Sequence, residues 1–264
     1  MKLGFIGCGN MAQAMMGGII AGNLIPADEI IASDGYKPSL EKTKENLGIH
    51  ITMDNKEVAV NSELIVLSIK PQFYDVVIKE IAPIIKEDTI IITIAPGKTL
   101  EDLENQFGKK VKIVRTMPNT PAMVGEGMTA MCANDLVAEK EMKEVKGILE
   151  GFGRVEMVPE YVMDAVVAVS GSSPAYVFMF IEALADGAVL QGMDRAQARI
   201  FAAQSVLGSA KMVLETKLHP AELKDMVCSP AGTTIEAVKT LEDRGFRSAV
   251  IQAMDSCAKR CKDM

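Results

Sequence analysis

Apolar and polar residues follow two different patterns along the chain, one before and one after about residue 158. Before it, short continuous runs of apolar, often β-branched residues alternate with stretches of helical periodicity. Continuous apolar runs are typical of parallel strands that are buried on both faces. They predict strands at residues 3–6, 30–33, 64–69, 89–94 and 112–116. The alternation with helices predicts βαβ units, and hence an α/β fold with a Rossmann-type parallel sheet.

The second part of the chain, residues 159–264, shows only helical signals. Asp194 stands in a capping position before Arg195, and Pro220 stands at the start of a further helix. The helix expected at residues 174–191 is apolar around most of its circumference. One small helical layer cannot bury such a helix, so a second chain is expected to cover it. The sequence therefore predicts an α/β domain of residues 1–158 and an all-helical domain of residues 159–264.

Composition narrows the classes of partner. The 264 residues carry a formal net charge of −7, which disfavours binding to nucleic acid or to an anionic membrane surface. The five cysteines lack a CxxC pair, so neither a disulfide framework nor a metal site is expected, and the cytoplasm fits best. The most apolar region contains Glu182 and Asp186, so no membrane span is expected. A small molecule is the expected partner.

A glycine-rich segment, GCGNMA from Gly7, directly follows the first predicted strand and opens a helix, which is the setting of a dinucleotide-binding motif. Gly7 permits a tight turn, Gly9 lets the backbone approach a pyrophosphate, and Ala12 allows the helix to pack closely on the strand. The helix N-terminus would face the phosphates. The competing interpretation is a glycine-rich turn that binds no ligand.

Asp34 ends the second predicted strand, where an acidic side chain binds the ribose hydroxyls of NAD and repels the extra phosphate of NADP. Lys37 is near enough in the sequence to attract that phosphate. Alternatively, Asp34 begins an Asx turn with Gly35. The residues alone therefore leave the choice between NAD and NADP open.

Two further loops, residues 68–71 and 94–97, follow predicted strands at the carboxyl edge of the sheet, where open α/β sheets bind ligands. We expect both loops to contact the nicotinamide half of the cofactor. The alternative is that Pro71 and Gly97 only end their strands.

Residues that usually polarise a carbonyl for hydride transfer are scarce. The two histidines are His50 and His219, and no lysine occurs between Lys146 and Lys211. His219 precedes Pro220 and fits a helix cap or a surface position better than a catalytic one. Such a chain suits a substrate that is already activated. A protonated imine is one, because its cationic C=N accepts hydride without a strong enzymatic acid.

Two segments of the helical domain, residues 170–176 and 228–234, join a turn of small residues to a predicted helix N-terminus. Free N–H groups and the helix dipole at such an end bind a carboxylate without an arginine. The hydroxyls of Thr233 and Thr234 could also bond a ring nitrogen. The alternative for each segment is ordinary N-capping by Ser or Thr.

These residues are similar to motifs of the pyrroline-5-carboxylate reductases, which catalyse the last step of proline synthesis. The similarity extends over nearly the whole chain, and its most specific motif is Lys224-Asp225 followed by the segment from Ser229 to Thr234. The matching segments are GFIGCGNM from Gly4, Lys70-Pro71, MPNTP from Met117, SGSSPAY from Ser170, HPAELKD from His219 and SPAGTT from Ser229.

Together with the residue patterns, the resemblance implies roles for particular residues. The cofactor would be held by Ile6, Gly7, Cys8, Gly9, Asn10, Met11, Asp34, Asn55, Ile69, Lys70, Pro71, Ala95, Pro96 and Gly97. The substrate would be held by Glu160, Ser229, Gly232, Thr233 and Thr234. The substrate carboxylate would rest on backbone N–H groups of the last loop, and Thr234, as the catalytic residue, would bond the imine nitrogen.

The resemblance further implies reduction of 1-pyrroline-5-carboxylate to L-proline with NADPH or NADH, and homodimers that can associate into larger rings. Relatives that prefer NADPH usually carry Ser or Thr in place of Asp34, so both NADP and NAD are kept as cofactors. A β-hydroxyacid dehydrogenase or another imine reductase shares the opening motif, but its catalytic lysine is missing here. A noncatalytic NAD(P)-sensing protein would need the glycine motif but not the loop at residues 229–234.

Overall fold

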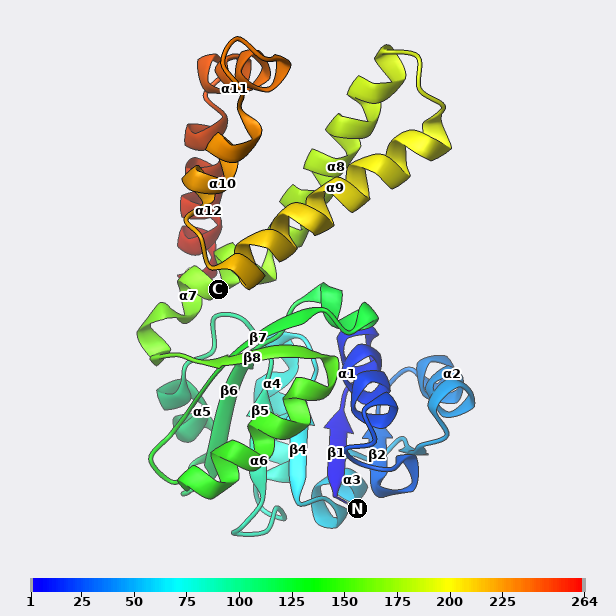
Figure 1. Ribbon diagram of the computed structural model, residues 1–264. Helices are drawn as coiled ribbons and strands as arrows, with labels where there is room; N and C mark the ends of the chain where they lie inside the picture. The colour runs from blue at the N-terminus through cyan, green and yellow to red at the C-terminus, as the bar shows by residue number, and fades with distance from the viewer. Residues whose placement is uncertain (1, 263–264) are drawn as a thin grey trace. The chain divides into compact units, whose positions relative to one another are not determined.

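The computed structural model describes residues 2–262 and divides into two compact units, whose elements are labelled in Figure 1. The first unit contains the residues up to Ser172 and those from Cys257 onward, and the second runs from Ser173 to Ser256. Packing therefore divides the chain later than residue 158, because Met163 is buried in the core of the sheet unit. A functional division at residues 158 and 159 stays a prediction.

An eight-stranded sheet in the order β3-β2-β1-β4-β5-β6-β7-β8 forms the first unit within residues 2–262. Strands β1 to β6 are parallel, β7 pairs antiparallel with β6, and β8 runs parallel to β7. The strands are β1 (Leu3–Ile6), β2 (Ile30–Ser33), β3 (His50–Thr52), β4 (Leu64–Leu67), β5 (Ile90–Thr93), β6 (Lys112–Met117), β7 (Gly127–Ala133) and β8 (Gly153–Met157). The Rossmann-type parallel sheet is confirmed, with an antiparallel addition that the sequence did not predict.

Helices cover both faces of this sheet (Figure 1). Each face of the sheet has its own apolar core, and alternate residues of a strand point into one core or the other. Phe5, for example, packs in one core and Ile6 in the other. The first layer contains α1 (Asn10–Ala21), α2 (Lys37–Leu47) and α6 (Glu139–Leu149). The second contains α3 (Asn55–Asn61), α4 (Tyr74–Ile81) and α5 (Leu100–Phe107). The continuous apolar strands thus have the two-sided burial that their composition requires.

The second unit is helical. Its elements are α8 (Ser173–Leu190), α9 (Arg195–Thr216), α10 (Pro220–Val227), α11 (Thr233–Asp243) and the first part of α12 (Phe246–Lys262), and α7 (Met163–Val166) precedes them in the sheet unit. Asp194 caps α9 by accepting from the amides of Ala196 and Gln197, as predicted. Small alanines form the contact between α8 and α9, namely Ala185, Ala198 and Ala202.

Large apolar side chains stay exposed on these helices. Phe178 and Met179 of α8 are 62% and 69% exposed, and Ile200 of α9 is 69% exposed. The helical stretch Glu160–Leu190 is long and apolar enough to cross a membrane by length and composition, although the sequence analysis expected no such span. Only 17% of its most apolar window is buried. The helices of this unit therefore carry large apolar side chains that stay exposed, as at sites where proteins bind one another.

Ion pairs at the amino edge of the sheet join strands to α6. The Lys112 ammonium lies 2.7 Å from Glu141 Oε1 and 3.4 Å from Asp88 Oδ1, and Lys2 lies 2.6 Å from Glu144. The hydrogen bond from Lys112 holds the pKa of Glu141 below its usual range, and the pKa of Lys112 is raised by Glu141. Both side chains of this pair are about a fifth to a quarter exposed, so solvent screens the pair only in part.

Glu141→Gln is expected to lower the free energy of unfolding at pH 7 by about 0.5–1 kcal/mol. A lowered carboxyl pKa stabilises the folded state fully above the unfolded value of about 4.3, so the difference should shrink as the pH falls below that value and through the lowered pKa of the folded state. Urea denaturation at pH 7 and at pH 3.5, roughly one unit below the unfolded value, measures it. Glutamine can still accept the Ala138 amide at the start of α6.

Glu139→Gln is the matched control, because Glu139 and Lys143 form a pair on the same helix whose two side chains are 85% and 74% exposed. This variant should change stability by no more than a few tenths of a kcal/mol. Equal losses of unfolding free energy in the two variants would show that the partly buried Lys112–Glu141 pair contributes no more than an exposed pair.

Candidate active site

The glycine-rich loop joins β1 to α1 through a turn that only glycine fits. Gly7 has φ +101°, and an added Cβ would lie 2.5 Å from the carbonyl oxygen of Ser68. The Ser68 hydroxyl donates to the Gly7 carbonyl at 2.8 Å, which ties this loop to the end of β4. The tight turn predicted at Gly7 is confirmed, and it lies between the carboxyl ends of neighbouring strands β1 and β4.

Gly9 forms the N-cap of α1, with φ −74° and ψ −177°. An added Cβ there would meet no atom of the described chain within 4 Å. No side chain of the described residues caps α1, so its first N–H groups are left for an anion, as at other helix N-termini that bind anionic groups. This is the geometry that a dinucleotide pyrophosphate requires at the second glycine of the motif.

Cys8 is fully buried between the two glycines and fixes the loop from the inside. Its carbonyl accepts from Ser39 Oγ at 2.8 Å and from Gln13 Nε2 at 2.9 Å. Burial raises the pKa of the Cys8 thiol, which contacts Thr43 Oγ1 at 3.2 Å. The thiol is therefore a packing group, and hydrogen bonds from Ser39 and Gln13 hold the loop around it.

Asp34 uses both carboxylate oxygens on backbone amides. Oδ1 accepts from Tyr36 N at 2.8 Å, which is the Asx turn through Gly35 that the sequence analysis kept as an alternative. Oδ2 accepts from Cys8 N at 2.7 Å. Lys37 is exposed and lies 3.5 Å from Glu41. Asp34 thus joins the end of β2 to the glycine-rich loop, a link that the sequence analysis did not predict.

Asn55 begins α3 and is also held on both sides. Its Oδ1 accepts from the Ser33 hydroxyl at 2.8 Å, and its Nδ2 donates to Glu80 at 2.9 Å. Ser33 is the last residue of β2. Asn55 therefore lies beside the carboxyl end of β2, on the same edge of the sheet as the glycine-rich loop.

The two loops expected at the nicotinamide, residues 68–71 and 94–97, follow the adjacent strands β4 and β5. Buried Tyr74 donates its hydroxyl to the Leu67 carbonyl at the end of β4, at 2.9 Å. Burial raises the pKa of Tyr74, so the hydroxyl remains a donor. Gly97 has φ +73°, which turns the chain away from β5 towards α5.

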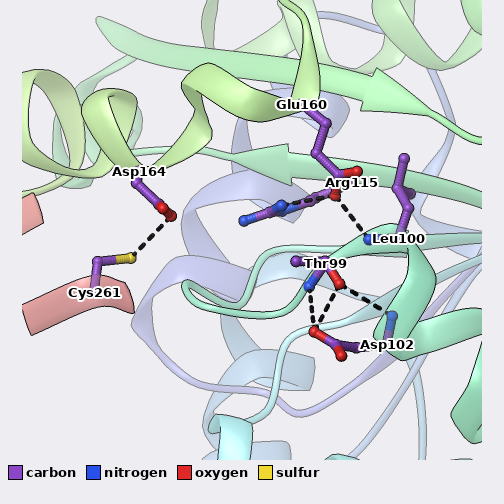
Figure 2. A network of polar contacts seen from close by, with 7 residues as sticks. All are labelled: Thr99, Leu100, Asp102, Arg115, Glu160, Asp164 and Cys261. Carbon is purple, nitrogen blue, oxygen red and sulfur yellow. Dashed lines mark hydrogen bonds and ion pairs between the residues drawn. The ribbon is translucent and has the colours of Figure 1, made fainter. Parts of the chain in front are cut away.

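Glu160 lies in a polar network shown in Figure 2. Its Oε1 accepts from Arg115 Nη1 at 2.7 Å and from the Leu100 amide at 2.7 Å. Arg115 comes from β6 and is buried, and Leu100 is the first residue of α5. Thr99 and Asp102 cap the same helix through a reciprocal capping box. Glu160 is therefore anchored next to the loop that follows β5.

The segment at residues 228–234 opens α11 in the way that the sequence predicts. Ala231 has φ +55°, the Gly232 amide donates to the Ser229 carbonyl at 3.0 Å, and Gly232 is the N-cap. Along the described residues, no side chain caps this helix end. Thr233 and Thr234 occupy its first two positions. Capping by Ser or Thr is thus absent from this helix, and its first N–H groups can bind an anion.

The segment at residues 170–176 does not form a free helix start, so this expectation was wrong. Residues 167–171 form a π-helical turn that continues α7, and the Ser172 amide donates to the Val167 carbonyl at 2.8 Å. Asn119 Nδ2 further donates to the Ser170 carbonyl at 3.1 Å. The small residues serve packing, since an added Cβ at Gly171 would lie 2.8 Å from the Met117 side chain. His219 caps α10 through its Nδ1, as expected.

Most of the expected cofactor residues gather at the carboxyl ends of β1, β2, β4 and β5 in the first unit, and Glu160 belongs to the same unit. Ser229, Gly232, Thr233 and Thr234 belong to the second unit. Sequence reasoning missed Arg115, although a single charged residue inside an apolar strand was a usable signal. It also missed Ser39 and Gln13, whose contacts no local pattern indicates.

Comparison with known proteins adds the family. A family model described as pyrroline-5-carboxylate reductase dimerisation matches residues 160–264, and one described as NADP oxidoreductase coenzyme F420-dependent matches residues 2–97. A pyrroline-5-carboxylate reductase of Escherichia coli strain K12 is 49% identical over 100% of this chain and 98% of its own length.

Two solved structures agree with this match. A pyrroline-5-carboxylate reductase from Coxiella burnetii is 36% identical, with a TM-score of 0.91 over 99% of this chain and 97% of its own. A pyrroline carboxylate reductase from Plasmodium falciparum, with NADP bound, is 32% identical with the same TM-score and the same coverage. The N-terminal sheet is the dinucleotide-binding domain and the C-terminal helices are the dimerisation domain. With nearly half of its residues shared along the full length of a curated relative, the chain belongs to the pyrroline-5-carboxylate reductase family.

Proposed function

We propose that this protein reduces 1-pyrroline-5-carboxylate to L-proline by hydride transfer from NADPH or NADH to the imine carbon. The observation that carries the proposal is the pair of helix N-termini open to anions, one in the glycine-rich loop and one in the SPAGTT segment from Ser229. The first suits a pyrophosphate and the second a carboxylate. The reaction needs these two anion sites and no strong enzymatic acid, because the substrate carries its own cationic C=N.

The glycine-rich loop fits a dinucleotide because the space above Gly9 is open and the adjacent N–H groups belong to a helix end. Ile6 to Met11 would hold the pyrophosphate, and Asp34 and Asn55 the adenosine half. Ile69, Lys70 and Pro71, with Ala95, Pro96 and Gly97, would contact the nicotinamide half. When bound, the cofactor supplies the hydride.

On the substrate side, backbone N–H groups around Ser229, Gly232 and Thr233 would hold the carboxylate. The Thr234 hydroxyl would bond the ring nitrogen and orient the C=N for hydride transfer. Glu160 would contribute a carboxylate near the nicotinamide loop, where its charge favours a cationic imine over a neutral analogue.

A direct assay tests the proposal. Purified protein is mixed with 1-pyrroline-5-carboxylate and either NADPH or NADH, and both cofactor oxidation and proline formation are measured. Equal amounts of proline and oxidised cofactor are expected. A protein that binds the cofactor but forms no proline would be a sensor or an enzyme for another imine, and the proposal would be rejected.

The exposed apolar surface of α8 and α9 is assigned to a subunit interface and not to a membrane, since the dimerisation model of the family covers both helices. We propose that the protein forms homodimers, which can associate further into rings of dimers. We also propose that it is located in the cytoplasm and binds neither membranes nor nucleic acid. Sedimentation of the purified protein should give a dimer or a multiple of it, and a monomer would contradict the assignment.

Asp34→Ser is expected to raise the specificity for NADPH relative to NADH roughly 10-fold, the effect of about 1.4 kcal/mol of charge repulsion near a phosphate. The variant also removes an acceptor from the Cys8 amide, so the two cofactors are compared as a ratio of kcat/KM within each enzyme. A wild-type enzyme that already prefers NADPH strongly would show that Asp34 acts only as a loop anchor.

A further inference from the structure

We propose that Arg115 is a positioning residue for the active site, which fixes the Glu160 carboxylate so that its free face meets the cationic imino acid. The inference rests on the proposed function, since it takes Glu160 as a substrate-binding residue. It assigns a role to a buried charge that the cofactor and substrate motifs leave unexplained.

The environment of Arg115 is unusual for a charged residue. It lies on β6 directly opposite Cys132 of β7, with 6% of its side chain exposed. Ile113 and Cys132 on the same face of the sheet belong to the buried core under α5. Burial, with the nearby Glu160 carboxylate as a smaller contribution, raises the pKa of Cys132 to about 11.

The two oxygens of the Glu160 carboxylate differ in their surroundings. Both recorded donors, Arg115 Nη1 and the Leu100 amide, bind Oε1 at 2.7 Å, while a third of the side chain remains exposed. Figure 2 shows the Arg115 side chain and the Leu100 amide meeting at Glu160. One oxygen is thus held by two donors from β6 and α5, and the carboxylate cannot rotate without breaking both bonds.

Stability alone gives a poor reason for this arrangement. A buried ion pair often contributes no more than well-packed apolar residues of similar volume would, because both ions lose hydration. Precise orientation of a ligand-binding group is a better reason, since a small misplacement at an active site costs much rate. The partner amide belongs to the first residue of the helix that follows the loop Ala95–Pro96–Gly97, so Glu160 is fixed relative to the nicotinamide loop.

Arg115→Met tests the role, because methionine fills an apolar site without a donor. We expect KM for 1-pyrroline-5-carboxylate to rise roughly 10-fold while the dissociation constant of NADPH changes less than about 2-fold. Arg115→Lys keeps the charge but not the planar fork, and should recover part of the loss. Glu160→Gln keeps an acceptor for both donors but removes the charge, and should raise KM by a similar factor.

The double variant decides between positioning and general destabilisation. If Arg115 acts through Glu160, Arg115→Met should add less than about 2-fold to KM in the Glu160→Gln background. Independent, multiplying effects, or equal losses in NADPH binding and kcat, would overturn the proposal. Arg154→Met is the matched control, since Arg154 also pairs with a glutamate, Glu156, but is 64% exposed, and its kinetics should match wild type.

Hydrogen exchange at the Leu100 amide gives a readout that does not depend on the reaction. Arg115→Met should speed this exchange because Glu160 is released from the amide, and an unchanged rate would overturn the positioning role. If Arg115→Met fails to fold, the same two measurements on Arg115→Lys decide. A wild-type enzyme that forms no proline would reject the proposed function and the substrate role of Arg115, while faster exchange would still show that Arg115 holds Glu160.

Discussion

Gly9→Val is expected to weaken NADPH binding roughly 100-fold, about the 3 kcal/mol that forcing bulk into a close contact costs. The branched side chain would occupy the space above the loop, where the pyrophosphate must approach the first N–H groups of α1. The fold should tolerate it, because the Gly9 φ of −74° suits any residue and an added Cβ meets no atom of residues 2–262 within 4 Å. Titration of the variant with NADPH, followed by fluorescence, measures the change.

Two other glycines serve as controls for this experiment. Gly147→Val on α6 adds the same side chain at another open position and should leave NADPH binding unchanged. Gly7→Ala should instead damage the loop itself, since φ is +101° and the new Cβ would lie 2.5 Å from the Ser68 carbonyl. Unchanged NADPH affinity in Gly9→Val, with a normal melting temperature, would reject the dinucleotide role of the motif.

The strands that the sequence predicts are those with continuous apolar runs. β1 and β2 match the predicted residues, and β4, β5 and β6 differ only at their ends. These five are neighbouring interior strands of the sheet. Helices cover both of their faces, so a run of apolar residues is enough to predict them. Their order in space follows from the βαβ rule, because right-handed crossovers leave few alternatives.

Three strands escaped prediction, each for a physical reason. β3 has three residues, is at the edge of the sheet and is partly exposed. β7 is rich in Ala, Met and Gly, which have little intrinsic preference for strands, so only its neighbours β6 and β8 make it one. β8 lies at the other edge of the sheet and has one buried residue, Val155. Edge and context-dependent strands are stabilised by tertiary pairing that local patterns do not contain.

The candidate site could be predicted at positions where the residue type itself indicates the backbone conformation. Gly7 and the SPAGTT turn are such places. Asp34 could not be decided, because its two amide partners come from residues 26 positions before it and two after it. The small residues from Ser170 were misjudged for a similar reason. Their continuation of α7 as a π-helical turn depends on packing against Asn119 and Met117.

Thr234→Ala is expected to lower kcat for imino acid reduction roughly 100-fold, the low end of what a group that positions a proton contributes. Thr234 occupies the second position of α11, after an N-cap glycine that has no side chain to occupy the free N–H groups. Those groups remain in the variant and can still hold the substrate carboxylate, so KM should change much less than kcat. NADPH binding should change much less than kcat, because Thr234 is assigned to the substrate and the glycine-rich loop, which we assign to the pyrophosphate, is left intact.

Thr234→Val is the stricter test, because valine keeps the β-branched shape and removes only the hydroxyl. It should lose as much kcat as Thr234→Ala, and Thr234→Ser should recover most of the rate by restoring the hydroxyl. Thr233→Val at the preceding helix position is the matched control for shape, and its effect on kcat should be smaller, since we assign Thr233 to the carboxylate and not to the ring nitrogen. Wild-type turnover in Thr234→Val, with NADPH bound normally, would show that the threonine only shapes the start of α11. The proton on the ring nitrogen would then have to come from water or from the iminium itself.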